Sequence, residues 1–246
     1  RHQLYPYVGF AMPRRQQRED ALLLRDHLGL QVVRTSHYPQ STHFLDCCDE
    51  IGLLVVTELP GWQHIGRDPR WRQNAVRQLQ EMIERDRNHP CVILWGVRIN
   101  ESADDDELYR QTNELARSLD PSRPTTGVRN FAASRLLEDV YAYNDFTHDG
   151  VRAALADPVR VTKDRTSPYM VTEHTGHMFP CLPDDPISVR TEHALRHARV
   201  LDAMYAHERI SGAIGWCMSD YQTSARFGGG DGVCHHGVCD MFRIPE

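Results

Sequence analysis

The stretch that decides the fold is residues 88–102, which read NHPCVILWGVRINES. Its centre, residues 91–95, is a continuous apolar run rich in Val, Ile and Leu, typical of a strand buried on both faces. The run is followed within a few residues by Asn100 and Glu101. A carboxylate just past the C-terminal end of a parallel strand occupies the edge at which α/β proteins place their sites. The alternative is that Glu101 belongs to the cap of the helix that follows.

Strand and helix patterns alternate along the rest of the chain. Apolar residues at helical spacing predict helices over 14–28, 41–51, 69–87, 105–119 and 187–207. Short apolar runs predict strands over 31–35, 53–57, 91–95, 125–128, 140–143, 168–172 and 212–216. Seven strands joined by crossover segments indicate a parallel sheet covered by helices. The sequence therefore predicts an α/β fold.

The alternation of strands and helices does not by itself separate a closed barrel from a doubly wound open sheet. The chain has 246 residues, close to the roughly 250 of a typical TIM barrel. If a first strand lay just before Arg1, the total would be eight, so we expect a (β/α)8 TIM barrel that lacks most of its first strand. A doubly wound open sheet is the alternative, but neither GxGxxG after a first strand nor GxxxxGK[ST] occurs. We expect no nucleotide cofactor.

Composition excludes several partner classes. The net charge is -6 and the pI about 6.2, which provides no basic stripe for nucleic acid or an anionic membrane. No apolar stretch approaches the roughly 20 residues of a membrane span, and the first residues, RHQLYPY, contain no secretory h-region. We expect a cytoplasmic protein, although a leader preceding Arg1 stays open.

Cysteine usage indicates reduced thiols. The count of seven is odd, and several cysteines lie within apolar patterns, which disfavours a disulfide framework. Cys234-His235-His236 followed by Cys239 is the one tract that suggests a metal. Zinc sites need a second, well-separated ligand pair, which this tract lacks. We expect no metal site.

Polar side chains follow several of the predicted strands. Glu101 and Glu173 each stand directly after an apolar run, so they would come from different strands that face one mouth. Paired carboxylates suit the cleavage of an acetal, since one protonates the leaving oxygen while the other meets the oxocarbenium-like centre. Glycoside hydrolysis is the reaction that this pair predicts. The other polar groups at strand ends are His37, Glu58, Asp145 and Asp220.

Four motifs together resemble the catalytic barrel of glycoside hydrolase family 2, which includes β-galactosidases, β-mannosidases and β-glucuronidases. They are VVRTSHYPQ, RDRNHPCVILWGVRINES, YMVTEHTGHMFP and GAIGWCMSDY, and the likeness runs from Arg1-His2 to about Asp220. In this family Arg-His follows the first barrel strand. The resemblance therefore implies that residues 1–246 are one catalytic barrel domain, excerpted from a longer protein with β-sandwich domains before it.

The resemblance also implies roles for individual residues. Glu101 would be the general acid/base and Glu173 the nucleophile of a retaining mechanism with a covalent glycosyl-enzyme intermediate. Asn100 would bind the sugar 2-hydroxyl. The other residues expected to contact the sugar are His2, Arg34, His37, Tyr143 and Trp216, the last as an apolar platform. Glu58 is equally compatible with a buried structural contact to Arg34.

Three departures from the family pattern bear on these roles. Five positions separate Trp95 from Asn100 where the family usually has four, which suggests a bulge at Arg98-Ile99. Trp62-Gln63-His64 replaces the Glu-x-His magnesium site of related β-galactosidases, so we expect no Mg²⁺ there. A tyrosine that commonly contacts the nucleophile would fall near Phe146, which cannot donate a hydrogen bond, and Tyr143 is the candidate substitute.

The sequence as a whole predicts a retaining β-glycosidase acting on terminal, non-reducing, neutral β-glycosides, with β-galactosides first. The β-glucuronidases of this family carry an Asn-x-Lys pair after the last strand, whereas residues 220–238 contain no lysine. β-Mannosides and other β-glycosides are alternatives, as is a non-catalytic carbohydrate-binding barrel. The expected partners are a carbohydrate and β-sandwich domains of the same chain, and homo-oligomer formation stays open.

Overall fold

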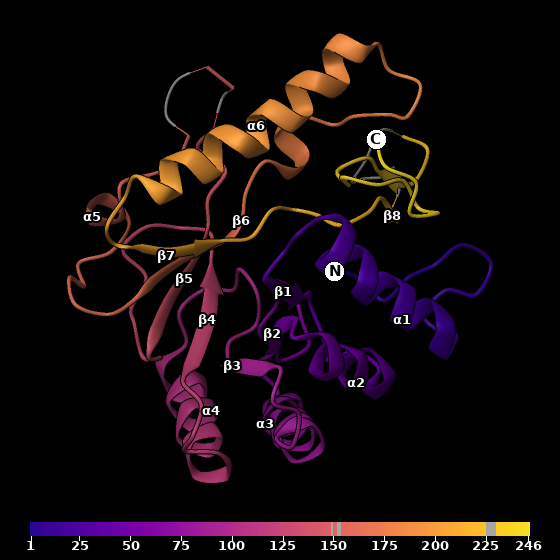
Figure 1. Ribbon diagram of the computed structural model, residues 1–246. Coiled ribbons are helices and arrows are strands. Elements are labelled where there is room, and N and C mark those ends of the chain that lie inside the picture. Colours follow the sequence, from indigo (N-terminus) through magenta and orange to yellow (C-terminus); the bar gives the residue numbers. More distant parts are fainter. Residues whose placement is uncertain (149, 152–153, 225–229) are drawn as a thin grey trace. The chain divides into compact units, whose positions relative to one another are not determined.

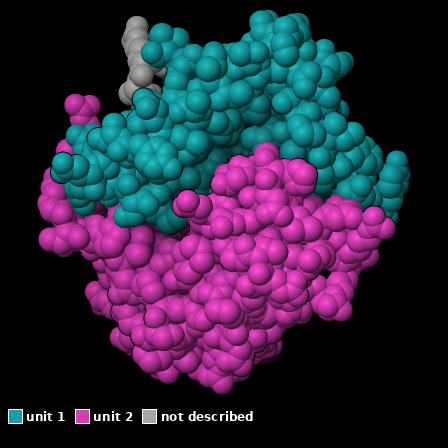
Figure 2. Space-filling model, in the orientation of Figure 1, with its two compact units in different colours: residues 1–12, 144–158, 170–246 teal, residues 13–143, 159–169 magenta. Residues whose placement is uncertain are grey.

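The computed structural model describes residues 1–148, 150–151, 154–224 and 230–246. The chain divides into two compact units, which Figure 2 colours separately. Unit 2 comprises residues 13–143 and 159–169, and unit 1 comprises residues 1–12, 144–158 and 170–246. The residues at 225–229, inside the lysine-free segment noted above, lie outside the described part.

Seven strands form one sheet, and they follow one another in chain order (Figure 1). The pairs from β1 to β5 are parallel. Their bounds are Val32–Thr35 (β1), Leu54–Glu58 (β2), Val92–Gly96 (β3), Thr125–Arg129 (β4), Val140–Asn144 (β5), Tyr169–Glu173 (β6) and Ile210–Ala213 (β7). The predicted α/β class is confirmed, with all seven strands present.

Helices follow β1, β2 and β3 in unit 2. They are α2 (Thr42–Ile51), α3 (Pro69–Asp86) and α4 (Asp106–Leu119), preceded by α1 (Arg14–Leu22) and a π-helical turn, Leu23–His27. Each of the three has a side-chain N-cap, because Ser41, Asp68 and Asp105 accept hydrogen bonds from backbone N–H groups of the first turn. Helix α1 packs against α2 and α3 against α4, while α2 and α4 also contact the strands that follow them (Figure 1).

The core of unit 2 lies between these helices and the strands. Leu79 and Ile83 of α3 are fully buried, as are Val55 of β2 and Trp95 of β3. All five residues of β4 are buried. Strands β3 and β4 are therefore buried on both faces, which the continuous apolar run at 91–95 predicts for β3.

Unit 1 holds the last part of the sheet, the helix α6 (Ile187–Tyr205) and smaller elements. Ile214 N donates to Val171 O, which joins the segment after β7 to β6. The short elements of unit 1 are a 3-10 turn, Gly176–Met178, and the antiparallel pair β8 (Tyr221–Gln222) and β9 (Val233–Cys234). The helical turn α5 (Pro158–Val161) spans the point where the chain returns to unit 2.

The last strand differs from the sequence prediction near the expected site. It is Ile210–Ala213, so Trp216 lies beyond its end and pairs through the backbone with Thr175. Strand β3 ends at Gly96, but the segment after it stays bonded to β4, because Val97 N donates to Thr126 O and Glu101 N donates to Val128 O. Four positions along this segment thus correspond to two along β4, which agrees with the predicted bulge at Arg98-Ile99. A second shift in register lies between β2 and β3, where Val55 pairs with Val92 but Val56 pairs with Leu94.

All seven cysteines are buried and none forms a disulfide, as predicted from their odd number and apolar surroundings. No helix among the described residues is long and apolar enough to cross a membrane.

Candidate active site

The carboxyl ends of β1 and β2 in unit 2 bring together a buried arginine, a histidine and a glutamate. Arg34 donates from Nε to Glu58 Oε2 at 2.7 Å and from Nη2 to Glu58 Oε1 at 2.9 Å. The same Nη2 donates to Asn100 Oδ1 at 2.8 Å. A bidentate arginine–carboxylate pair fixes the guanidinium in one plane, so Arg34 holds the side chain of Asn100 in one orientation.

His37 is oriented by the same glutamate. Its Nδ1 lies 2.9 Å from Glu58 Oε1 and 3.1 Å from Arg34 Nη2. Because a carboxylate only accepts, the hydrogen bond to Glu58 forms in the tautomer that carries the proton on Nδ1, and Nδ1 then cannot accept from Arg34. Burial alone raises the pKa of Glu58, but Arg34 and His37 outweigh it and hold that pKa below its ordinary value. Glu58 therefore carries a negative charge that these two residues neutralise.

Glu101 lies on a turn just past β3. It has a positive φ of 55°, unusual for a residue with a side chain. Trp62 Nε1 donates to Glu101 Oε2 at 2.9 Å, and Gln63 Nε2 donates to the same oxygen at 3.1 Å. Backbone bonds hold the two segments together, since Gln63 N donates to Asn100 O at 2.8 Å. Trp62 and Gln63, in the segment predicted to bind no Mg²⁺, thus orient the carboxyl of Glu101.

Glu173 is the last residue of β6 and belongs to unit 1, where it is 5% exposed. Its carbonyl accepts a hydrogen bond from Asp145 N at 2.8 Å. Burial raises the pKa of the nearby Cys217 thiol, and the charges of Asp220 and Glu173 raise it further. Glu173 thus lies at the carboxyl end of its strand, as predicted, close enough to Cys217 for its charge to act on that thiol.

Aromatic rings surround the position of Trp216 in unit 1. His2 stacks on Tyr221 with ring centroids 4.4 Å apart and meets Trp216 edge-on at 5.2 Å. Trp216 Nε1 donates to Tyr221 Oη at 3.3 Å. The backbone of Trp216 is bonded to residues just after Glu173, because Trp216 N donates to His174 O and Gly176 N donates to Trp216 O. His2 and Trp216, both predicted to contact sugar, therefore lie together.

Buried histidines follow Glu173 in unit 1. His174 and His197 have ring centroids 5.3 Å apart, and His197 lies 5.1 Å from His193. Burial, assisted by the neighbouring histidines, lowers the pKa of His174 to about 3 and that of His197 to about 4. These imidazoles are neutral around neutral pH and cannot supply positive charge to Glu173.

Tyr143 and Phe146 belong to different units. Tyr143, in β5, is half-buried in unit 2 with its ring 6.5 Å from that of Tyr169. Phe146 belongs to unit 1 and packs on His177 with centroids 4.5 Å apart. The contact of Tyr143 with the nucleophile stays a prediction.

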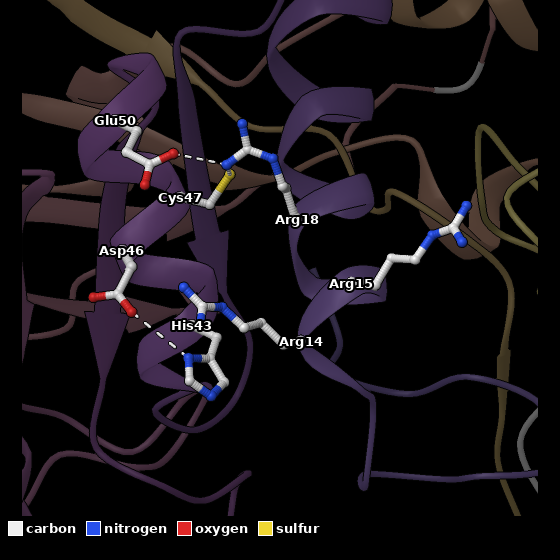
Figure 3. A pocket seen from close by; sticks show the side chains of 7 residues that line it. All are labelled: Arg14, Arg15, Arg18, His43, Asp46, Cys47 and Glu50. Atoms are coloured by element: carbon white, nitrogen blue, oxygen red, sulfur yellow. Dashed lines mark hydrogen bonds and ion pairs between the residues drawn. The ribbon is translucent and has the colours of Figure 1, made fainter.

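A hollow elsewhere in unit 2 is separate from the strand ends. It lies between α1 and α2 (Figure 3) and has a volume of about 450 Å³. Two pairs of side chains lie within it, Arg18 with Glu50 at 2.7 Å and His43 with Asp46 at 3.6 Å. It contains none of the residues predicted to act on substrate. Its lining residues are Arg14, Arg15, Arg18, His43, Asp46, Cys47 and Glu50.

The Cys234–Cys239 tract lies in unit 1. His235 Nδ1 pairs with Asp220 at 2.7 Å and its Nε2 with Asp231 at 2.9 Å. Within the described ranges, no three His, Cys, Asp or Glu side chains are grouped closely enough to hold a metal ion.

Sequence reasoning missed three residues of these clusters. Trp62 and Gln63 act on Glu101 from a different loop, and Tyr221 acts on Trp216 from the short strand β8. Local patterns of hydrophobicity carry no signal for such contacts. Trp62 is the one with a signal in the sequence, because tryptophan is mostly a buried residue and this one follows Pro60-Gly61 in a loop after a predicted strand.

The sequence that forms these strands and strand-end residues matches one protein family. The family model for glycosyl hydrolases family 2, TIM barrel domain, matches residues 1–206. The chain belongs to this family.

Relatives and solved structures point to the same group. The chain is 55% identical to a β-galactosidase of Thermoanaerobacterium thermosulfurigenes, covering 100% of this chain and 34% of that protein. It is 53% identical to a β-galactosidase of Thermoanaerobacter pseudethanolicus, covering 100% and 32%. A β-galacturonidase of Eisenbergiella tayi, solved with galacturonate, superimposes with a TM-score of 0.86 at 27% identity, covering 100% of this chain and 48% of that one. The chain thus spans about a third of the length of these curated relatives.

Proposed function

We propose that this chain is the catalytic barrel of a retaining β-glycosidase that removes terminal β-galactosyl residues. The observation that carries the proposal is the setting of Glu101, whose carboxyl is oriented by Trp62 and Gln63 beside the Asn100 that Arg34 holds. The β-galactosidases at 53% and 55% identity support the choice of sugar.

In the proposed mechanism Glu173 attacks the anomeric carbon and forms a covalent glycosyl-enzyme intermediate. Glu101 gives its proton to the departing glycosidic oxygen, so the aglycone leaves as a neutral alcohol. In the second step Glu101 takes a proton from water, and the water oxygen displaces Glu173 with retention of configuration. Oε2 of Glu101 already accepts two hydrogen bonds, so the transferable proton is carried by Oε1.

The other predicted residues would bind the sugar. Asn100 would accept or donate to the 2-hydroxyl, where hydrogen bonds strengthen in the transition state. His37 and Arg34 would line the same pocket, and Trp216, braced by His2 and Tyr221, would present an apolar face to the ring. Tyr143 remains the candidate donor to Glu173.

A uronic acid is the second candidate substrate, because the solved β-galacturonidase has the same fold over the whole chain. The absence of lysine from residues 220–238 argues for a neutral sugar. We also infer that the full-length protein carries β-sandwich domains, given the greater length of its relatives. Light scattering on that protein would determine whether it forms homo-oligomers.

The test is a panel of 4-nitrophenyl β-glycosides assayed on the full-length protein. It should contain the galactoside, mannoside, glucoside, glucuronide and galacturonide, with Glu173→Gln as the inactive control. We expect the highest kcat/KM on the galactoside and a first-formed product of β configuration by NMR. Faster turnover of a uronide would contradict the sugar assignment. Binding of galactose without any turnover would favour a carbohydrate-binding barrel.

A further inference from the structure

Arg98 is the unexpected feature of the segment between β3 and Glu101. It lies within the stretch from Trp95 to Asn100 that is one position longer than the family pattern, and its side chain is 1% exposed. A guanidinium is costly to bury unless its charge is paired. Contacts within the fold must therefore compensate for the burial of the Arg98 guanidinium.

The side chain of Arg98 spans the turn that carries Glu101. Its Nη2 donates to Asp104 Oδ1 at 2.5 Å and lies 3.4 Å from Ser102 O. The guanidinium also lies over the ring of Tyr109, 4.7 Å from its centroid. These contacts join the residue before Asn100 and Glu101 to residues beyond them, so they close residues 98–104 into a loop.

Neighbouring groups fix both ends of this loop. A Cβ at Gly127 of β4 would lie 2.6 Å from Arg98 Cβ, so glycine at that position makes room for the arginine stem. Asp104 accepts hydrogen bonds from Ser134 Oγ at 2.6 Å and from Arg135 N at 3.1 Å. Burial raises the pKa of Asp104, but the bonds from Ser134 and Arg98 outweigh it and hold that pKa below its ordinary value.

The turn inside the loop is strained and carries the candidate acid/base. Glu101 has a φ of 55°, a conformation that costs free energy for a residue with a Cβ and persists only when its surroundings hold it. Ser102 Oγ bonds to Ile99 O at 2.8 Å and to Tyr109 Oη at 2.5 Å. The ring that supports the Arg98 guanidinium thus also fixes the turn.

We propose that Arg98 is a positioning residue for the acid/base step: by binding Asp104 across the turn, it fixes where the carboxyl of Glu101 lies. This inference rests on the proposed function, in which Glu101 protonates the leaving group. Arg98 acts through this turn, because its buried guanidinium is bound to Asp104 and lies over Tyr109. A displacement of about 1 Å at a catalytic group can lower a rate about 100-fold.

The test compares two leaving groups in the full-length protein. A 2,4-dinitrophenolate leaves without protonation, whereas methoxide needs the acid. We expect Arg98→Met to lower kcat/KM on methyl β-galactoside about 10- to 100-fold more than on the dinitrophenyl galactoside. Arg98→Lys, which keeps the charge, should recover part of the loss, and Asp104→Asn should show the same selectivity. Loss of structure alone would reduce both substrates equally, because it lowers only the amount of active enzyme.

Two reference variants make the outcome decisive. Arg123→Met is the matched control: Arg123 also pairs with an aspartate, Asp120 at 2.5 Å, and lies over an aromatic ring, but at the opposite end of β3. Arg123→Met should lower the stability of the protein, but it should not lower kcat/KM on methyl β-galactoside more than on the dinitrophenyl galactoside. Glu101→Gln should show the largest selectivity, and if it shows none, the proposed role of Glu101 fails. If Glu101→Gln is selective while folded Arg98→Lys and Asp104→Asn are not, the positioning inference alone is wrong.

Discussion

At the scale of single residues, the buried carboxylate of Glu58 orients neighbouring side chains, which is a structural role rather than a catalytic one. Its two oxygens hold Arg34 and His37, and Arg34 in turn holds Asn100. The sequence left a structural contact between Glu58 and Arg34 as an equal alternative to catalysis, and the structure has this contact. Removing one partner of such a pair leaves the other charge buried and uncompensated.

We therefore expect Glu58→Gln to lower the free energy of unfolding by about 3–5 kcal/mol. Urea denaturation would measure the change. Glu50→Gln is the control, because the Arg18–Glu50 pair has the same 2.7 Å separation with both side chains more than half exposed, and exposed pairs contribute little to stability. Equal losses in the two variants would show that burial of the Arg34–Glu58 pair has no energetic weight.

At the scale of elements, strands with continuous apolar runs were predictable and the last strand was not. Residues 91–95 predicted β3 to within one position of Val92–Gly96, because both faces of that strand are covered by apolar contacts. The GAIGW segment has the same composition as a strand, yet Trp216 takes its backbone partners from His174 and Gly176 rather than from a ladder within β7. Long-range pairing of this kind, like that of Trp62 and Gln63 with Glu101, leaves no local periodicity.

The close approach of β2 and β3 gives a prediction at this scale. A Cβ added at Gly96 would lie 2.4 Å from Glu58 Cβ and 2.8 Å from its Cα, so one of the two backbones must shift. Gly96→Ala should destabilise the protein by about 1–3 kcal/mol, the range for overpacked cores, and thermal unfolding would measure it. Gly212→Ala in β7 is the control, since its nearest atom lies 3.9 Å away. A melting temperature of Gly96→Ala no lower than that of the control would contradict the packing.

At the scale of the whole molecule, the buried histidines of unit 1 couple stability to pH. Burial holds the pKa of His174 at about 3 and those of His197 and His236 at about 4. In the unfolded chain these groups take up protons below about pH 6.5. Because the unfolded state then binds more protons than the folded one, the free energy of unfolding is highest above about pH 6.5 and falls as the pH drops toward about 4.

Unfolding in urea at pH 7.5 and pH 5.0 would test this coupling. We expect a lower free energy of unfolding at pH 5.0 and a smaller difference between the two pH values in His197→Gln, which cannot take up a proton. His43→Gln, at an exposed position on α2, should keep the difference of the original protein. If removal of His197 leaves the pH dependence unchanged, the cluster does not govern acid stability.

In the proposed mechanism Glu173 forms a covalent bond to the sugar while Glu101 acts as acid and base. The most direct measurement is inactivation of the full-length protein with 2,4-dinitrophenyl 2-deoxy-2-fluoro-β-galactoside, followed by peptide mapping. The fluorine slows both steps, whereas the dinitrophenolate keeps the first step fast enough for the intermediate to accumulate. We predict a fluorogalactosyl group on Glu173 and its absence from the Glu173→Gln variant. A label on Glu58, Asp145 or Glu101 would contradict the assignment.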